Sequence, residues 1–426
     1  MANEPTPTPP QSCPTPDFYV YEWAALESAD PCGDGVIVRW RDGTELRCHP
    51  LWLRENLIGD PLAGLDGIDP VTRETTVDLA RLPADLRLID VGVKGGALAV
   101  AFEPEGLQAT YHPGWLRHVA EGRHQPASHL PDAVAWTTTD LAEPPTHDGS
   151  AVLDDDEVLR RWLHDLVAFG VARLENTPAD PRHLEAVVAR IGELRGSNFG
   201  RIWHVDVDVD PVSTANTSLR LPAHTDLPTR ETPPGFQYLH CIENDVDGGA
   251  STMTDGLAVA EHLRATEPDA LEALRTLEWV FFNRAQDHDH RWTGPFVDDG
   301  DGRIPYTFRA FHPVRAFPAM DPNEVGRGYA ALRTFAEVAN SERFQMRYPF
   351  RVGDIVAFDN RRVLHGRDSF DVGSGGRRRL HGTYMDTDEV YSRLRVLARR
   401  ADAPHERAAD PVATNPVSNR IEESNV

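Results

Sequence analysis

Short apolar runs separated by turn signals dominate the first 120 positions of the chain. Runs of four to six residues are too short for helices and are typical of β-strands. Turn-forming pairs, Asp42-Gly43 and Gly95-Gly96, lie between them. The runs are Phe18–Tyr21, Gly35–Trp40, Glu45–Cys48 and Ala97–Phe102. This pattern predicts a small β-rich domain over residues 17–120.

Helical and extended patterns are mixed after residue 150. Apolar residues recur at helical spacing in four segments, of which the third is interrupted at Pro268. These segments are Asp154–Phe169, Arg182–Leu194, Asp255–Leu277 and Asn323–Ala339. Apolar β-type runs fill much of the rest: Val171–Leu174, Gly235–Ile242, Ile304–Phe308, Asp354–Phe358 and Leu380–Met385. The absence of a regular βαβ alternation argues against a doubly wound sheet and predicts a mainly β domain with peripheral helices over residues 151–401.

Three segments have little periodicity. Residues 121–150 carry several Pro, His, Thr and Asp residues, which predicts a linker. Residues 1–16 are rich in Pro and Thr, and residues 402–426 are polar. Both ends are therefore predicted to be disordered tails.

Composition limits the kind of partner. The 426 residues are 40% hydrophobic, enough for a sizeable core, and the net charge of -24 argues against nucleic acid or an anionic membrane. The four cysteines show no C-x-x-C spacing, so a disulfide framework is not expected. No apolar run approaches the roughly 18 residues of a membrane span, and the start lacks the features of a secretory signal. These observations predict a soluble, cytoplasmic protein.

Two histidines and one aspartate are candidate metal ligands. His224 and Asp226 are two positions apart, so both side chains point to one face of an extended segment. His365 follows Asp226 by 139 residues, at the end of an apolar strand. Two imidazoles and a carboxylate can bind one face of a ferrous ion and leave the other positions open. The alternative is a turn capped by Thr225 or Asp226 beside a surface histidine.

An arginine follows at a suitable distance. Arg378 lies thirteen residues beyond His365 and offers a planar fork to a carboxylate. Arg377 and Arg379 are its rivals, and a solvated basic run is the alternative. Together with the three ligands, this arginine indicates an enzyme that binds iron, an oxo-acid and oxygen.

Further motifs follow one another in a specific order. They are His224–Pro228, Pro233–Ile242, Gly248-Gly249, Asp255-Gly256, Leu364–Arg367 and Val390–Leu397. Their order and spacing resemble the γ-butyrobetaine hydroxylase / trimethyllysine hydroxylase family of taurine-dioxygenase-like iron(II)/2-oxoglutarate oxygenases. The resemblance extends from about Phe18 to Arg399. It implies a double-stranded β-helix (jelly roll) preceded by a small β domain, often in a homodimer.

The resemblance also implies roles for individual residues. By position, His224, Asp226 and His365 would bind Fe(II), and Arg378 would bind the cosubstrate 2-oxoglutarate. Leu239 and Ser251 would line the cosubstrate pocket. Oxygen would then be consumed, with release of succinate and CO2.

The first departure from the family concerns zinc. Many members hold a zinc ion in the N-terminal domain through three cysteines and a histidine. The matching stretch, Trp52–Leu62, contains no cysteine, and Leu107 stands where the histidine is expected. Structural zinc needs thiolate or imidazole donors, so no zinc is expected here.

The second departure concerns the substrate. Betaine enzymes of the family enclose a trimethylammonium group in aromatic faces. The matching positions keep Phe199, Trp203 and Tyr384, but Asn216 and Leu227 replace two others. Polar residues that would suit a carboxylate or phosphonate lie in the same segments: Arg201, His204, Arg220, Arg230 and Arg309. Alternatively, these arginines are solvated and the aromatic residues belong to the core.

The sequence thus predicts an Fe(II)/2-oxoglutarate-dependent dioxygenase whose substrate is a small zwitterion such as a betaine, an amino acid or a (trimethyl)aminophosphonate. Hydroxylation is the default outcome, with desaturation or rearrangement left open. The alternative is a non-catalytic small-molecule-binding or regulatory protein that keeps the fold. A hydrolase built on Ser251 or Ser369 has little support, because neither serine lies in a Gly-x-Ser-x-Gly elbow.

Overall fold

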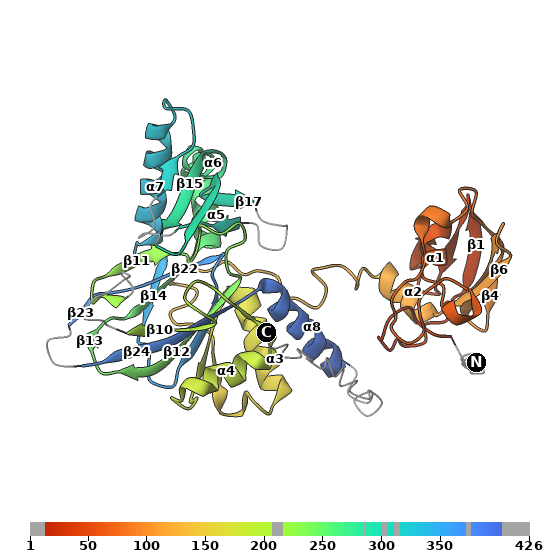
Figure 1. The fold of residues 1–426 in the computed structure, drawn as a ribbon, viewed down its shortest axis with the longest axis horizontal. Helices are drawn as coiled ribbons and strands as arrows, with labels where there is room; N and C mark the ends of the chain where they lie inside the picture. Colours follow the sequence, from red (N-terminus) through yellow and green to blue (C-terminus); the bar gives the residue numbers. More distant parts are fainter. Residues whose placement is uncertain are drawn as a thin grey trace, which may run out of the picture. The chain divides into compact units, whose positions relative to one another are not determined.

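A computed structural model describes residues 13–206, 216–284, 286–299, 306–310, 316–371 and 376–402. The chain divides into two compact units, Met1–Ser128 and His129–Val426 (Figure 1).

Unit 1 contains two small antiparallel sheets. One is formed by β1 (Ser28–Cys32), β2 (Gly35–Arg39) and β3 (Glu45–Cys48), and the other by β4 (Arg87–Lys94), β5 (Ala97–Glu103) and β6 (Leu107–Tyr111). Helices α1 (Pro50–Glu55) and α2 (Pro113–Ala120) complete the unit, with short 3-10 turns at Pro61–Ala63 and Leu79–Arg81. Both sheets and both helices contribute to one apolar core, in which Val38, Leu53, Phe102 and Leu116 are buried.

A large sheet forms the base of unit 2. Its strands lie in the order β10-β24-β12-β21-β8-β7, and β9 also pairs with β24. Their bounds are β7 Thr146–Asp148, β8 Val171–Glu175, β9 Leu194–Arg195, β10 Ile202–Asp206, β12 Phe236–Asn244, β21 Ile355–Asp359 and β24 Arg378–Met385. The outer face of this sheet packs on helices α3 (Asp156–Phe169), α4 (Pro181–Ala189) and α8 (Thr387–Asp402), around buried Trp162, Tyr238 and Met385.

A second sheet faces the first. It has the order β11-β22-β14-β20, with β11 Leu221–His224, β14 Ser251–Asp255, β20 Gln345–Tyr348 and β22 Val363–Arg367. Side chains from both sheets share one core: Cys241, Val356, Phe358 and Leu380 come from the large sheet, and Met253, Met346, Tyr348 and Val363 from the small one. The two sheets therefore pack face to face, and the candidate ligands come from their facing side.

The remaining elements lie outside this pair of sheets. Helices α5 (Gly256–Thr266), α6 (Pro268–Thr276) and α7 (Val325–Ala339) pack with the hairpin strands in the upper part of Figure 1. These strands are β15 Glu278–Arg284, β16 Asp289–Pro295, β17 Val297–Asp299, β18 Tyr306–Phe308 and β19 Ala316–Pro318. Two short strands, β13 (Asp247–Gly248) and β23 (Phe370–Asp371), pair with each other.

Several local predictions differ from the structure. Phe18–Tyr21 is not a strand: Phe18 is 68% exposed, and Tyr19 and Tyr21 pack on His118 instead of pairing with a neighbour. The helix predicted to Leu194 ends at Ala189. The helix predicted over Asp255–Leu277 is two helices, separated at Pro268 as the sequence indicated.

Part of the predicted linker, residues 121–150, belongs to unit 2. Residues from His129 onward group with unit 2, and β7 pairs in parallel with β8. Trp136 is 1% exposed, and its backbone N–H donates to Asp255 Oδ2 at 3.0 Å. The predicted tails lie mostly outside the described residues, which begin at Cys13 and end at Asp402.

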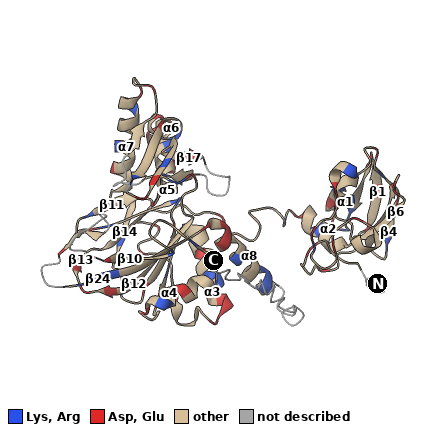
Figure 2. Cartoon of the chain, in the orientation of Figure 1, with Lys and Arg blue, Asp and Glu red and all other residues tan. Residues whose placement is uncertain are grey.

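Both units carry acidic and basic residues (Figure 2). Among the described residues, no helix has the length and apolarity needed to cross a bilayer.

Candidate metal centre and active site

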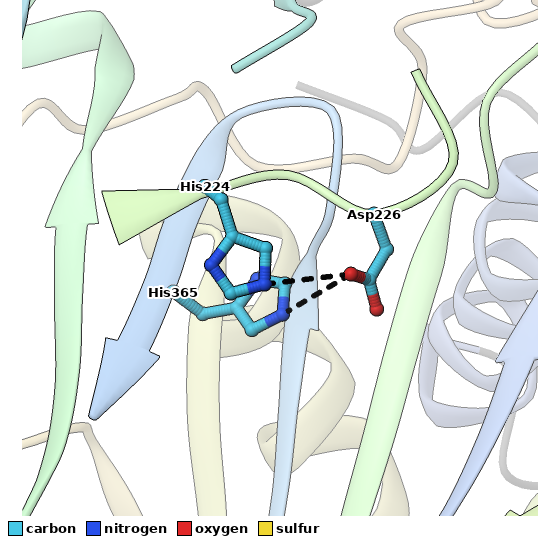
Figure 3. Close-up of side chains that lie close together, drawn as sticks. All are labelled: His224, Asp226 and His365. Carbon is cyan, nitrogen blue, oxygen red and sulfur yellow. Dashed lines mark ion pairs between the residues drawn. The ribbon is translucent and has the colours of Figure 1, made fainter. Parts of the chain in front are cut away.

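Strand pairing brings the two candidate histidines together. Strands β11 and β22 are antiparallel, and His224 lies directly opposite His365. Their ring centroids are 4.2 Å apart, and Asp226 follows β11 by two residues. One donor atom from each of the three residues lies within 4.8 Å of the other two (Figure 3). This is the only such group of three or more found in the described part of the chain.

A hydrogen bond orients the ring of His224, and burial keeps the ring of His365 neutral, so both can act as ligands. Nδ1 of His224 lies 2.9 Å from the carbonyl oxygen of Pro222, which can only accept, so Nδ1 carries the proton and Nε2 offers a lone pair. Burial lowers the pKa of His365 to about 3. The ring of His365 is therefore neutral, as metal coordination requires.

Asp226 is ionised and presents one oxygen to both rings. Oδ1 lies 3.5 Å from Nε2 of His224 and 3.7 Å from Nε2 of His365 (Figure 3). Burial alone would raise the pKa of Asp226, but His365, His224 and the Tyr384 hydroxyl hold it below its usual value. The Tyr384 hydroxyl donates to the other oxygen, Oδ2, at 2.8 Å.

The backbone around Asp226 is held by buried polar groups. Asn360 accepts from the Asp226 N–H and donates to the Asp226 carbonyl. The hydroxyl of Thr225 donates to the Phe308 carbonyl at 3.0 Å and accepts from the Ala310 N–H at 2.9 Å. Leu227, which follows Asp226, has a φ of 53°. This value lies in the left-handed region, which a bulky side chain rarely adopts. The surrounding contacts hold this unfavourable conformation in place.

Arg309 supports the same loop. Its Nη1 donates to the carbonyls of Pro228 and Arg230, each at 2.7 Å, and its Nη2 donates to the Glu231 carbonyl at 2.9 Å. The side chain is 2% exposed. These contacts argue against the predicted role of Arg309 in substrate binding.

The donor set suits a ferrous ion. Two imidazoles and one carboxylate on a single face are the ligands of non-haem iron(II) oxygenases, and they leave coordination positions for other molecules. The pairing of β11 with β22 and the hydrogen bonds of Asn360 position these side chains.

Arg378 is a buried cation in the interior that the two sheets enclose. It is 6% exposed, its Nε has no hydrogen-bond partner, and no ion pair joins it to a carboxylate within the described ranges. Burial lowers its pKa. Burial and the charge of Arg378 also lower the pKa of neighbouring Arg367 to about 10. Two adjacent buried guanidinium groups favour binding of an anion between or beside them.

The two rival arginines lie elsewhere. Arg377 is exposed. Arg379 points to the opposite face of β24, where its Nε lies 3.3 Å from Asp206. Only Arg378 of the three is buried in the interior.

The other predicted cosubstrate residues lie on the facing sides of the two sheets. Ser251 is 7% exposed and lies opposite Arg367 in the pairing of β14 with β22. Leu239 is partly buried and packs on the core between the sheets.

The predicted substrate residues fall into two groups. The rings of Trp203 and Tyr384 pack together with centroids 5.3 Å apart, and Leu227 is buried next to the ligand Asp226. Phe199 is 50% exposed, and Asn216 donates to the backbone carbonyl of Asp206 at 2.9 Å. Of the predicted aromatic residues, Tyr384 contacts the candidate ligand Asp226 directly, and Trp203 packs on Tyr384.

Known proteins resemble this chain over most of its length. Residues 136–384 match the family described as taurine catabolism dioxygenase TauD, TfdA family. A gamma-butyrobetaine dioxygenase of Pseudomonas sp. (strain AK-1) is 37% identical over 88% of this chain and 96% of its own length. A mitochondrial trimethyllysine dioxygenase of Mus musculus is 28% identical over 84% of this chain and 85% of its own length.

The chain belongs to this family. It is an iron(II)- and 2-oxoglutarate-dependent dioxygenase, as the sequence predicted, and this decides against a non-catalytic binding protein. Among solved structures, an asparagine oxygenase matches the dioxygenase with 19% identity and a TM-score of 0.46, over 57% of this chain and 93% of the other.

The sequence does not single out Asn360 as a contact of Asp226, and it indicates only part of the role of Tyr384. Asn360 is fully buried. The signal in the sequence is a polar residue directly after the apolar strand Ile355–Asp359, since a buried polar group needs a hydrogen-bond partner. Tyr384 was assigned only to the substrate, although its hydroxyl reaches the candidate ligand.

Proposed function

We propose that this dioxygenase hydroxylates a small zwitterion with a trimethylammonium group at one end and a carboxylate at the other. His224, Asp226 and His365 bind the iron, and Arg378 binds the distal carboxylate of 2-oxoglutarate. The observation that carries these roles is the convergence of three donor atoms within 4.8 Å in the interior where Arg378 is buried without a carboxylate. When iron is bound, it supplies the redox chemistry that couples oxidation of 2-oxoglutarate to succinate and CO2 with oxidation of the substrate.

The protein groups position the reactants and exclude water. Arg378 orients 2-oxoglutarate through a bidentate, charge-assisted contact that is strong because the surroundings are buried. Leu239 and Ser251 complete the cosubstrate pocket, one with an apolar surface and the other with a hydroxyl. We also propose that the two facing sheets form a double-stranded β-helix.

The aromatic pair supports a quaternary ammonium group as the cationic end. The faces of Trp203 and Tyr384 can attract a trimethylammonium group by about 2 kcal/mol when water is excluded. The named activity of the Pseudomonas relative, on a betaine, supports the same substrate class. Leu227 and Asn216 offer no π-face, so the aromatic contact depends mainly on Trp203 and Tyr384, with Phe199 as an exposed third member.

A substrate panel tests this proposal. The protein is incubated with Fe(II), ascorbate and 2-oxoglutarate, and with γ-butyrobetaine, 4-aminobutyrate or a trimethylammonium phosphonate of similar length. We expect succinate and a product heavier by one oxygen with the trimethylammonium carboxylate. Faster turnover of the primary amine would assign an amino acid instead, and faster turnover of the phosphonate would replace the carboxylate end. Succinate at the level of the substrate-free control with all three compounds would contradict the proposal.

A pair of variants tests the aromatic contact. Trp203→Phe keeps a π-face, whereas Trp203→Leu removes it. We expect Trp203→Leu to raise KM for the trimethylammonium substrate by about 30-fold relative to Trp203→Phe, which corresponds to roughly 2 kcal/mol. Equal KM values in the two variants would remove the aromatic contact from the proposal. The predicted homodimer stays a prediction, which sedimentation of the full chain checks.

A further inference from the structure

Tyr384 contacts the candidate iron ligand Asp226 through its hydroxyl and Trp203 through its ring. It lies in β24, is 2% exposed, and its hydroxyl donates to Asp226 Oδ2 at 2.8 Å. The other oxygen, Oδ1, is the one that approaches both histidines (Figure 3). The two oxygens of Asp226 therefore have separate partners.

The position of the Tyr384 hydroxyl is fixed from the opposite side of its ring. The ring packs on Trp203 with a centroid distance of 5.3 Å. Trp203 in turn lies against Gly382, where an added Cβ would come within 2.3 Å of the indole ring. Since an aromatic ring packed in this way cannot change rotamer without moving its neighbours, the hydroxyl stays directed at Asp226.

We propose that Tyr384 is a positioning residue that makes Asp226 a ligand through one oxygen only. The inference rests on the proposed function, in which Asp226 binds the iron. A hydrogen bond to a buried carboxylate stabilises by about 1.5–3 kcal/mol. Bidentate coordination by Asp226 would have to break or distort this bond.

The consequence for the enzyme concerns the number of open positions at the metal. A carboxylate that binds through one oxygen occupies one position, and two histidines occupy two more. If the bound ion has six positions, three would then remain for 2-oxoglutarate and oxygen, whereas a bidentate carboxylate would leave only two. Tyr384 thereby keeps a position available that the reaction needs.

Tyr384→Phe tests the inference because it removes the hydroxyl and keeps the ring that packs on Trp203. Binding of Mn²⁺ to the full-length protein is measured by calorimetry without oxygen. The carboxylate bands are measured by infrared difference spectra with and without Zn²⁺. In the unsubstituted protein we expect the wide band splitting of one-oxygen coordination. In Tyr384→Phe we expect a narrower splitting and a Kd for Mn²⁺ raised by about 10- to 100-fold.

Tyr238→Phe is the matched control. Tyr238 is also buried in the large sheet, but it faces helix α3. Within the described residues, the one hydrogen bond of its hydroxyl is to Met385 Sδ at 3.8 Å. We expect its metal affinity and its spectrum to equal those of the unsubstituted protein.

The outcomes separate the inference from the proposed function. If His224→Ala binds Mn²⁺ as tightly as the unsubstituted protein, the metal site itself is misassigned, and both ideas fail. If His224→Ala loses the metal while Tyr384→Phe keeps its affinity and band splitting, only the inference fails. A two-oxygen splitting in the unsubstituted protein would overturn it without any variant.

Discussion

Asn360 holds the backbone of Asp226 on both sides. Its Oδ1 accepts from the Asp226 N–H at 2.7 Å, and its Nδ2 donates to the Asp226 carbonyl at 3.0 Å. Nδ2 also lies 3.3 Å from the Pro234 carbonyl. Asn360 is five residues before His365, so one short segment supplies a candidate ligand and fixes the backbone of another.

The first prediction concerns Asn360→Ala. It leaves the buried N–H and carbonyl of Asp226 without partners, which costs about 1–3 kcal/mol for each group. We expect a lower free energy of unfolding and a Kd for Mn²⁺ raised by about 10- to 100-fold, because the ligand is no longer held in place. Urea unfolding and calorimetry measure the two effects.

A control separates stability from positioning. Thr254 is fully buried in β14, and its hydroxyl donates to the Ala339 carbonyl at 2.8 Å. Thr254→Val should also destabilise the protein but leave its affinity for Mn²⁺ unchanged. A loss of affinity of the same size in both variants would assign the effect of Asn360 to general destabilisation.

The second prediction concerns Arg378→Ala. Removal of one member of a buried charge pair costs about 2–5 kcal/mol, so we expect the Kd for 2-oxoglutarate to rise by roughly 30-fold or more. The ligand-free variant should be as stable as the unsubstituted protein or more so, because a buried cation beside Arg367 is removed. Calorimetry with Mn²⁺-loaded protein and thermal unfolding without ligand measure both quantities.

Arg379→Ala is the control for this prediction. Arg379 is paired with Asp206 on the opposite face of the same strand. Its loss should not change the affinity for 2-oxoglutarate. If Arg379→Ala weakens 2-oxoglutarate binding and Arg378→Ala does not, the role belongs to Arg379.

Most strong periodic segments of the sequence are elements of the fold. The apolar runs that begin at Gly35, Glu45 and Ala97 are strands, since each finds a neighbour to pair with. Phe18–Tyr21 has the same β-type composition but no partner strand, which a local pattern does not reveal. The helix after Arg182 ends at Ala189, and beyond it Gly192 passes so close to Glu389 that an added Cβ would lie 2.0 Å from its carboxylate. That contact comes from almost two hundred residues away.

The candidate site was predictable where it depended on residue type and spacing. His224, Asp226 and His365 do converge, because β11 and β22 pair in a register that places the histidines opposite each other. The contacts of Tyr384 depend on a second sheet and could not be read from spacing. The role of Arg309 could not be predicted either, because its hydrogen bonds to three carbonyls depend on the path of the loop after Asp226.

The third prediction concerns acid stability. Burial lowers the pKa of His240 to about 4, and the charges of His183 and His381 add to this effect, while Asp180 opposes it. The unfolded chain binds a proton near pH 6.5, so it holds more protons than the folded protein between pH 6.5 and 4. The free energy of unfolding should therefore fall as the pH is lowered through this range, by at most about 3 kcal/mol for this residue.

Urea unfolding at pH 7 and pH 5 measures this dependence. His240→Gln removes the titrating group and should make the loss between these pH values smaller. An equal loss of stability at pH 5 in His240→Gln and in the unsubstituted protein would assign the acid sensitivity to other groups.

The fourth prediction concerns what stabilises unit 1. Arg54 is 4% exposed, and it donates to both oxygens of Glu105 at 2.8 and 3.1 Å and to the Asp66 carbonyl at 2.9 Å. The pair joins helix α1 to the turn between β5 and β6, near the stretch Trp52–Leu62, where many family members hold zinc and this sequence predicts none. Removal of one partner from a buried pair costs about 3–5 kcal/mol, so Glu105→Ala should strongly destabilise this unit. Glu45→Ala, which removes an exposed partner of Arg39, should have little effect.

Prolonged chelation should leave hydrogen exchange of the β5 amides unchanged, because packing and the Arg54–Glu105 ion pair hold unit 1 without metal. Faster exchange after chelation, restored by Zn²⁺, would show that a metal stabilises it after all.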